Sequence, residues 1–450
     1  MSIRKKIITC NFYFVVMFLA AYTINRNFMI VATLIPTMFI LLTREQQFAL
    51  AEILFLLPFS ATMTMRTETT SLFMIPKLAF IIKYFIMGNT KISVKIVSRL
   101  IVLFMYAVLT NIFQETFPLV RILNLLLWFF IGYLMIQMLP QSKCMDITCG
   151  TFVGGTIMTG VIGLMKEMFP NLASELTENQ YRNELSGEII DRFAGLWNDP
   201  NGYTIFLICA LFATVWLMQN KKIGAIKFSF LSVLLSVLGV LTLSKSCALL
   251  LVGFWACFIV LNRSITITKK IGALTLVGAI CLVAASFFTD TLSELIYRFT
   301  SARGSEGKFD VTLLTSNRSN LWVSYILAIF KGNFITGFGI DAPLVGTHAP
   351  HNTYIQLLYE WGMIGTVIYI WTWSAMLFET RKQKFNIIPT LFLLIAIFFL
   401  GCVYIEFLYF MLPLMVCCGK NQQGDITNIK TSRHFLDRDC DVKSKNAFFK

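Results

Sequence analysis

Charge is scarce in this sequence, and the residues that most often build metal or redox sites are few and scattered. Only 14% of the 450 residues are Asp, Glu, Lys or Arg, and there are three histidines. The eleven cysteines form no CxxC pair, and only Cys417 and Cys418 are adjacent. We therefore infer neither a disulfide framework nor a transition-metal site. Gly337-Phe338-Gly339 is not continued as a GxGxxG or Walker pattern, so it does not indicate a nucleotide-binding loop.

Apolar residues are abundant instead. They make up 56% of the chain, against roughly 45–50% in soluble globular proteins, and the mean hydropathy is +0.71. Such a composition predicts an all-α fold, a polytopic transmembrane helical bundle of about 12–14 helices with a large outer-face loop. The apolar runs that are long enough to span a bilayer lie at about 7–24, 27–43, 46–65, 70–88, 96–113, 118–139, 147–169, 202–219, 225–243, 247–262, 271–289, 353–378, 387–400 and 402–417.

The distribution of Lys and Arg predicts the orientation of the bundle. If the N-terminus is cytoplasmic, alternation of the spans places most basic loop residues on the same side, as the positive-inside rule requires. These residues are Arg4, Lys5, Lys6, Lys91, Lys95, Lys143, Lys221, Lys222, Arg263, Lys269, Lys270, Arg381, Lys382 and Lys384. The formal net charge of +14 is then mostly this inside bias, and it gives no reason to invoke nucleic acid.

The same alternation divides the chain into six segments. Two polar segments fall on the outer side, and loops of their length usually have a function. The predicted segments are N-terminal transmembrane helices (1–169), an outer loop (170–201), further transmembrane helices (202–289), a large outer loop (290–352), C-terminal transmembrane helices (353–418) and a cytoplasmic tail (419–450).

Three basic residues on the predicted outer side occur next to predicted helices. Arg192 precedes a helix, although nearby acidic residues are alternative partners for it. Lys245 lies where one helix ends and the next begins, a place that membrane-interface snorkelling alone would explain. Arg318 lies in the large outer loop, where a solvated arginine is the default. Each residue alone has an ordinary explanation, but all three are expected on one face.

Two of the three histidines lie where the large outer loop meets a predicted membrane helix. His348 and His351 precede the span that begins near residue 353, and imidazole titrates near neutral pH. Asn352 is a candidate either to orient the imidazole or simply to cap the helix. Glu360 falls about two turns into this helix, where a carboxylate is costly unless it is paired or hydrated. We expect Gly362 and Gly365 to permit close helix packing.

These motifs, taken in order, resemble the O-antigen ligase and O-antigen polymerase superfamily. The resemblance covers about residues 190–370. It is carried by Arg-Phe-Ala-Gly-Leu-Trp-Asn-Asp-Pro-Asn from 192, Leu-Thr-Leu-Ser-Lys-Ser from 241, Asn-Arg-Ser-Asn-Leu-Trp from 317 followed by Gly337-Phe338-Gly339, and His351-Asn352 through Gly362 and Gly365. Members usually have Arg where this chain has Lys245, which keeps the charge but loses the bidentate fork.

The resemblance implies a membrane glycosyltransferase whose donor is a glycan on undecaprenyl diphosphate, with an active site on the outer face of the bacterial plasma membrane. Arg192, Lys245 and Arg318 would bind the diphosphate. His351 would be the general base, with His348 in reserve and Asn352 and Glu360 in supporting or acceptor-side roles. No cofactor and no metal are expected, and a sugar-nucleotide donor is disfavoured.

Three activities remain as alternatives at this stage. A polymerase joins repeat units of O-antigen or capsule on the carrier, and this is the activity we expect. A ligase passes the finished glycan to a lipid A core, and its motifs overlap heavily with those of a polymerase. A polysaccharide flippase is disfavoured because the charges lie at the rim and no inverted repeat is evident. The expected partners are the lipid-linked oligosaccharide and the bilayer, and a chain-length regulator is kept open.

Overall fold

The computed structural model describes residues 3–65, 71–87, 93–114, 117–140, 142–176, 180–182, 189–261, 318–346, 348–378 and 387–419, with a few isolated positions between 262 and 317. It confirms the predicted polytopic helical class. Within the described residues, five helices are long and apolar enough to cross a membrane: Arg4–Thr23, Val94–Asn111, Leu119–Met138, Lys143–Leu164 and Pro200–Gln219. The predicted span 271–289, most of the outer segment before residue 318 and the tail from residue 420 lie outside the described residues.

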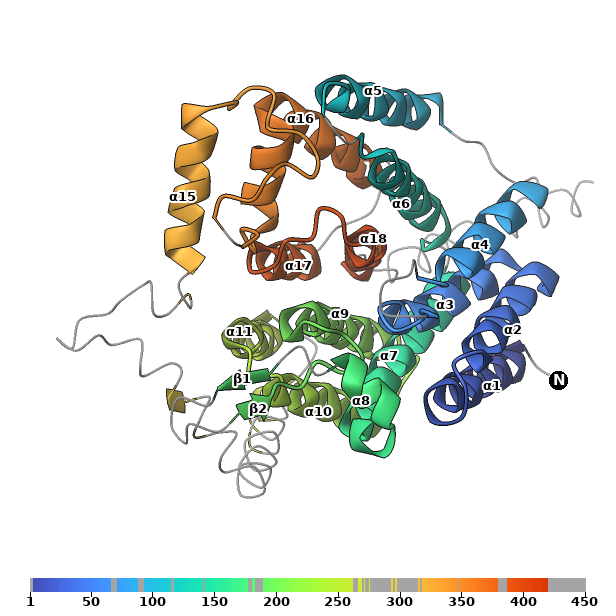
Figure 1. Ribbon diagram of the computed structural model, residues 1–450. Coiled ribbons are helices and arrows are strands. Elements are labelled where there is room, and N and C mark those ends of the chain that lie inside the picture. Colours follow the sequence, from blue (N-terminus) through green and yellow to red (C-terminus); the bar gives the residue numbers. More distant parts are fainter. Residues whose placement is uncertain are drawn as a thin grey trace, which may run out of the picture.

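Each of the other predicted apolar runs overlaps a helix (Figure 1). The α-helices are α1 (Ile3–Thr23), α2 (Phe28–Leu42), α3 (Gln46–Leu56), α4 (Met74–Ile86), α5 (Val94–Asn111), α6 (Leu119–Met138), α7 (Ser142–Leu164), α8 (Pro170–Leu176), α9 (Pro200–Gln219), α10 (Ala225–Leu241), α11 (Lys245–Leu261), α15 (Arg318–Lys331), α16 (Thr353–Phe378), α17 (Ile388–Phe398) and α18 (Phe407–Cys418). Two 3-10 turns, η1 (Leu57–Phe59) and η2 (Lys166–Met168), follow α3 and α7.

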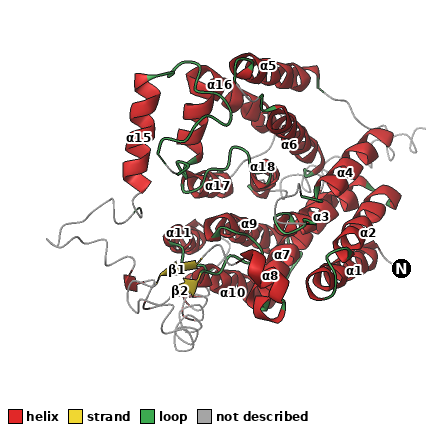
Figure 2. Ribbon diagram, in the orientation of Figure 1, coloured by secondary structure: helices red, strands yellow, loops and turns green. Residues whose placement is uncertain are grey.

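The strands in the described residues form one short hairpin (Figure 2). It consists of β1 (Gln180–Arg182) and β2 (Ile189–Asp191), which pair antiparallel with Tyr181 opposite Ile190. The hairpin lies in the predicted outer loop 170–201. It brings the chain back toward the bundle directly before Arg192.

Helices α9 and α18 lie in the interior of the bundle. In α9, 89% of the apolar window is buried, against 22% in the peripheral helix α5, and every residue of α18 is buried. Figure 1 shows α9 between α7, α10 and α11 on one side and α17 and α18 on the other. Because α9 and α18 are apolar around their whole circumference, they are stable only where other helices enclose them.

Ion pairs mark the two ends of the bundle. At one end, Asp146 binds Arg4 (2.7 Å) and Lys222 (3.6 Å), so the N-terminus and the starts of α7 and α10 lie together. At the opposite end, which we call the distal end, Arg26 binds Glu175 at 3.2 Å. This grouping agrees with the alternation of the predicted spans. Which membrane face each end occupies stays a prediction.

Helix α16 is broken at Gly362, whose φ of 61° and ψ of −172° are non-helical. The segment 334–340 lies against the break and binds the main-chain groups that the break leaves open. These bonds are Phe338 N to Tyr359 O (2.9 Å), Gly339 N to Glu360 O (2.9 Å), Met363 N to Phe334 O (2.9 Å) and Ile364 N to Ile335 O (3.1 Å). The polar groups of the break are therefore satisfied, as a membrane requires.

The two glycines of α16 thus differ. Gly365 faces the ring of Tyr106 on α5 so closely that a Cβ would overlap it, which fits the expected close packing. Gly362 instead breaks the helix. The sequence motif did not reveal this difference, because the partner of Gly362 is the main chain of a distant segment.

Candidate functional site

The start of α9 is fixed by the sequence Asp199-Pro200-Asn201. Asp199 has an extended backbone and caps the helix, since its carboxylate accepts from the amide of Asn201 at 2.8 Å. Pro200 follows at the first helical position, where its fixed φ suits the helix and its missing N–H costs nothing. The side-chain oxygen of Asn201 accepts from the hydroxyls of Ser244 (2.7 Å) and Ser246 (3.0 Å). The start of α9 is therefore tied to the start of α11.

The turn between α10 and α11 is three residues long and places two of the predicted cations together. Leu243 has a left-handed φ of 52°, which allows the chain to reverse within Thr242, Leu243 and Ser244. The carbonyl oxygen of Thr242 accepts from Nε and Nη2 of Arg192, both at 3.3 Å. Lys245 is the first residue of α11. Arg192 and Lys245 thus lie at the two ends of one short turn.

Arg318 begins a helix, whereas the sequence placed it in a solvated loop. It is half-buried at the start of α15, and its Nη1 donates to the carbonyl oxygen of Phe399 at 2.8 Å. Phe399 is the residue that follows α17. Arg318 therefore joins the outer segment to the turn between α17 and α18.

His351 lies two residues before α16, with its backbone in the left-handed region (φ 46°), which a residue with a Cβ seldom adopts. Asn352 is fully buried and caps α16, because its side-chain oxygen accepts from the amides of Tyr354 (3.0 Å) and Ile355 (3.1 Å). The capping role considered for Asn352 is therefore present. Thr353 follows and bonds through its hydroxyl to the carbonyl oxygen of Leu400.

The surroundings of His351 favour its neutral form. Burial is the largest cause that lowers the pKa of His351 from its ordinary value, and the positive charge of Arg318 and the neighbouring His348 lower it further. The carboxylate of Asp199 acts in the opposite direction. His351 is thus close enough to Arg318 on α15 and to Asp199 on α9 to sense both charges.

These contacts bring four helix starts to the distal end of the bundle. Arg318 and Thr353 bond to the consecutive carbonyl groups of Phe399 and Leu400. The side chain of Leu400 lies beside Gly202 in the first turn of α9. The starts of α9, α11, α15 and α16 therefore converge. With them come Arg192, Lys245, Arg318 and His351, which are as many as 159 residues apart in the chain.

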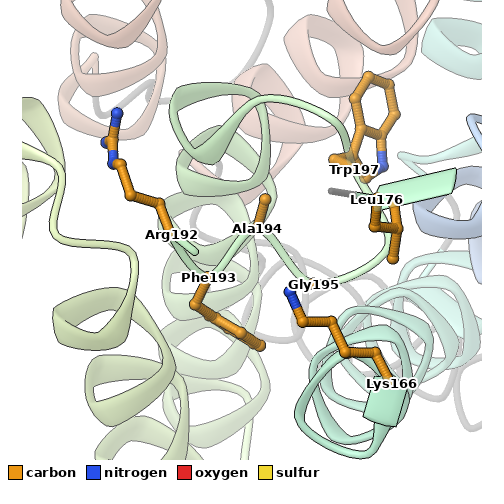
Figure 3. A pocket seen from close by; sticks show the side chains of 8 residues that line it. Lys166, Leu176, Arg192, Phe193, Ala194, Gly195 and Trp197 are labelled. Atoms are coloured by element: carbon orange, nitrogen blue, oxygen red, sulfur yellow. The ribbon is translucent and has the colours of Figure 1, made fainter. Parts of the chain in front are cut away.

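A shallow pocket lies beside Arg192, with about 220 Å³ of empty space when the open solvent at its mouth is included (Figure 3). It is bounded by the ends of α7 and α8 and by the segment after Arg192, and its lining residues are Gly163, Lys166, Leu176, Arg192, Phe193, Ala194, Gly195 and Trp197. Figure 3 shows Lys166 directed toward Gly195, while Arg192 points away from it. Lys166 adds a further cation near Arg192, and no motif indicated it.

Two of the predicted supporting residues, His348 and Glu360, lie in different surroundings. The side chain of His348 is exposed, while its carbonyl oxygen accepts from the hydroxyl of Tyr325 at 3.0 Å. Glu360 lies nine residues beyond His351, beside the break in α16, and its carboxylate accepts from Gln356 at 3.0 Å. Glu360 therefore belongs to the broken part of the helix and not to the cluster of helix starts.

Sequence reasoning also gave too small a role to Asp199. It gave this residue no role in the site, whereas the structure places it at the start of α9, where its charge raises the pKa of His351. The Asn-Asp-Pro-Asn sequence is a recognisable helix-start signal and would have predicted the cap. The proximity to His351 has no such signal. Among the described residues, no group of three or more His, Cys, Asp or Glu side chains is arranged to hold a metal ion.

The fold and the distal cluster define a multi-pass membrane protein with several cations and a histidine at converging helix starts. Residues 230–370 match the family model described as O-Antigen ligase, so this part of the chain is similar to that family. Lys245, Arg318 and His351 lie inside the matched range, and Arg192 lies before it. No curated protein and no solved structure matched the chain.

Proposed function

We propose that this protein is a polymerase of lipid-linked polysaccharide repeat units, as in O-antigen or capsule synthesis. It would transfer a glycan from undecaprenyl diphosphate to an acceptor sugar hydroxyl at the outer leaflet. The observation that carries the proposal is the convergence of Arg192, Lys245, Arg318 and His351 at four helix starts. Cations beside a base suit displacement of a diphosphate.

The position of the cations supports an anionic ligand. Lys245 and Arg318 are each the first residue of a helix. The helix macrodipole disfavours a cation at such a position by about 0.3–1 kcal/mol. A bound diphosphate would benefit from both the side-chain charges and the helix starts. Arg192 is oriented toward the same turn through its bonds to the carbonyl oxygen of Thr242.

His351 and the three cations would have separate roles in the reaction. Neutral His351 would take the proton of the acceptor hydroxyl as its oxygen attacks the anomeric carbon. The bond from that carbon to the diphosphate oxygen breaks, and the configuration inverts. Negative charge that develops on the leaving undecaprenyl diphosphate is stabilised by Arg192, Lys245 and Arg318 without a metal. The lowered pKa of His351 supports this role, since the imidazole is then neutral at pH 7.

Lipid-linked intermediates from a deletion strain test the proposal directly. A polymerase mutant accumulates single repeat units on the carrier, because they are flipped but not joined. Complementation with the wild-type gene should restore long chains, and complementation with the His351→Ala variant should not. Normal chain lengths in the deletion strain would refute the proposal.

Ligation is the second candidate, because the matched family model is itself described as O-Antigen ligase. In that case the deletion strain accumulates full-length polymer on the carrier. We favour polymerization because the long N-terminal series of helices, α1–α9, precedes the matched range. Both activities use the same donor and the same cluster. The six predicted segment boundaries and the location of the cluster on the outer face of the plasma membrane are also part of this proposal.

A further inference from the structure

The turn between α17 and α18 (residues 399–406, called the α17–α18 loop) contacts two elements of the proposed site. Its first carbonyl group, that of Phe399, accepts from Arg318 at 2.8 Å. The next carbonyl group, that of Leu400, accepts from the hydroxyl of Thr353, which in turn accepts from the amide of Cys402 at 2.9 Å. The loop therefore fixes both the Arg318 guanidinium and the first turn of α16, directly after His351.

The far end of this loop is anchored by a buried ion pair. Glu406, the last loop residue, binds the ammonium group of Lys77 in the first turn of α4. The side chains of Lys77 and Glu406 are only 3% and 13% exposed, and the Lys77 ammonium also lies 5.0 Å from the ring of Phe73. Both residues are outside the range that matches the family model. A buried pair of this kind is a poor source of net stability but a strong constraint on geometry.

We propose that Lys77 is a positioning residue: its ion pair with Glu406 fixes the α17–α18 loop, and the loop in turn positions Arg318 and the start of α16. The N-terminal helices thereby contribute to the site through a contact that the family motifs do not contain. This inference rests on the proposed function. It adds that catalytic geometry depends on α4, which carries no residue of the cluster.

The test uses the fact that the chain has only three histidines, His348, His351 and His434. In the purified full-length protein with labelled histidines, the His351 imidazole can be titrated by NMR without any substrate. The charged groups that face it are Arg318 from α15, Asp199 from the start of α9 and His348 from its own segment. If Lys77→Met releases the loop, Arg318 withdraws and the pKa of His351 rises. The acid limb of turnover then moves to higher pH, and turnover falls by roughly tenfold to a hundredfold from misplacement.

Arg26→Met is the matched control. It removes another cation of the N-terminal half at the same end of the bundle, where Arg26 binds Glu175 and the carbonyl oxygen of Thr64 (2.8 Å). This variant should lower the thermal midpoint but leave the His351 titration and the pH limb unchanged. An equal shift in both variants would reduce Lys77 to a general stabilising residue and overturn the proposal, as would no shift in Lys77→Met.

A second variant tests the proposal if the Lys77→Met protein does not fold. Glu406→Gln removes the negative charge but keeps an oxygen that accepts from Lys77, so a smaller shift in the same direction is expected. An unchanged His351 titration in folded Glu406→Gln would overturn the proposal. If the wild-type protein transfers no glycan at all, the proposed function fails, while the titration still decides whether Lys77 positions the loop.

Discussion

Two cations of the N-terminal helices form ion pairs, whereas the described bonds of two cations in the site go to the main chain. In the N-terminal part, Arg26 and Lys77 bind carboxylates, those of Glu175 and Glu406. In the site, Arg192 and Arg318 bond to main-chain carbonyl oxygens of a turn and a helix end. The described contacts of Arg26 and Lys77 therefore hold helices together, whereas those of Arg192 and Arg318 fix the direction of each guanidinium group.

The largest effect is expected at the base of the cluster. His351→Ala should abolish glycan transfer, because no other described imidazole lies among the converging helix starts, while expression and donor binding stay nearly intact. In vitro transfer from a lipid-linked donor measures this. His348→Ala serves as the control and should reduce transfer less, since its side chain is exposed. Normal polymer from the His351→Ala variant would remove this residue from the mechanism.

Substitution of three arginines by alanine tests this comparison between the N-terminal helices and the site. Arg192→Ala and Arg318→Ala should each weaken donor binding by about 1–3 kcal/mol, the cost of a lost charge-assisted hydrogen bond. Arg26→Ala should leave donor affinity unchanged and lower the thermal midpoint instead, because its partner is Glu175. Donor affinity and melting curves of the three purified variants measure both effects. Equal loss of affinity in all three would contradict the distinction.

The broken helix is a second feature that separates the site half from the continuous helices. Gly337 has a φ of 77° and lies against the main chain of Glu360 and Gly362, so Gly337→Ala should destabilise the protein by more than about 1 kcal/mol. Gly346 has a similar φ of 81° but open space around it. Gly346→Ala is therefore expected to cost only the free energy of holding a residue with a Cβ at a positive φ. Similar melting temperatures for the two variants would show that the close approach at the break is not required.

A smaller effect concerns pH. Only neutral His351 acts as a base, and it is neutral above its pKa. Since burial and Arg318 lower that pKa, transfer should persist below pH 6.5, the value of an ordinary imidazole. Asp199→Asn removes the charge that, among the described residues, raises the pKa of His351, and it still caps α9, because Asn is an equally good capping residue. The acid limb of the pH–rate profile should therefore move to lower pH. A move to higher pH would contradict this placement of Asp199.

The smallest expected effect is that of a chelator. If the cations of the cluster neutralise the leaving diphosphate, excess EDTA should not change the rate of transfer by the purified enzyme. Mg²⁺ can bind through one or two carboxylates together with substrate phosphates, so Asp191 and Asp199 are the residues to examine if this fails. Loss of turnover in EDTA, with recovery on addition of Mg²⁺ or Mn²⁺, would replace the cation mechanism by a metal-dependent one.

Hydropathy and local helix signals alone determined the class of this protein. A bilayer accepts only segments whose main-chain polar groups are satisfied internally, so the apolar runs had to become helices, and alternation placed the rim cations on one face. The Asn-Asp-Pro-Asn sequence likewise contains the residues that cap and begin helix α9. Such properties depend on neighbours in the chain, and the sequence contains those neighbours.

Only the tertiary structure decided which helix starts meet and what holds them. The bonds of Arg318 to Phe399 and of Asn201 to Ser244 join segments 81 and 43 residues apart. The break at Gly362 is satisfied by segment 334–340, and Lys77 finds Glu406 at a separation of 329 residues. A carbonyl oxygen or a carboxylate attracts any cation that the packing brings near it. The choice of partner is therefore a property of how whole helices pack, and no local pattern records it.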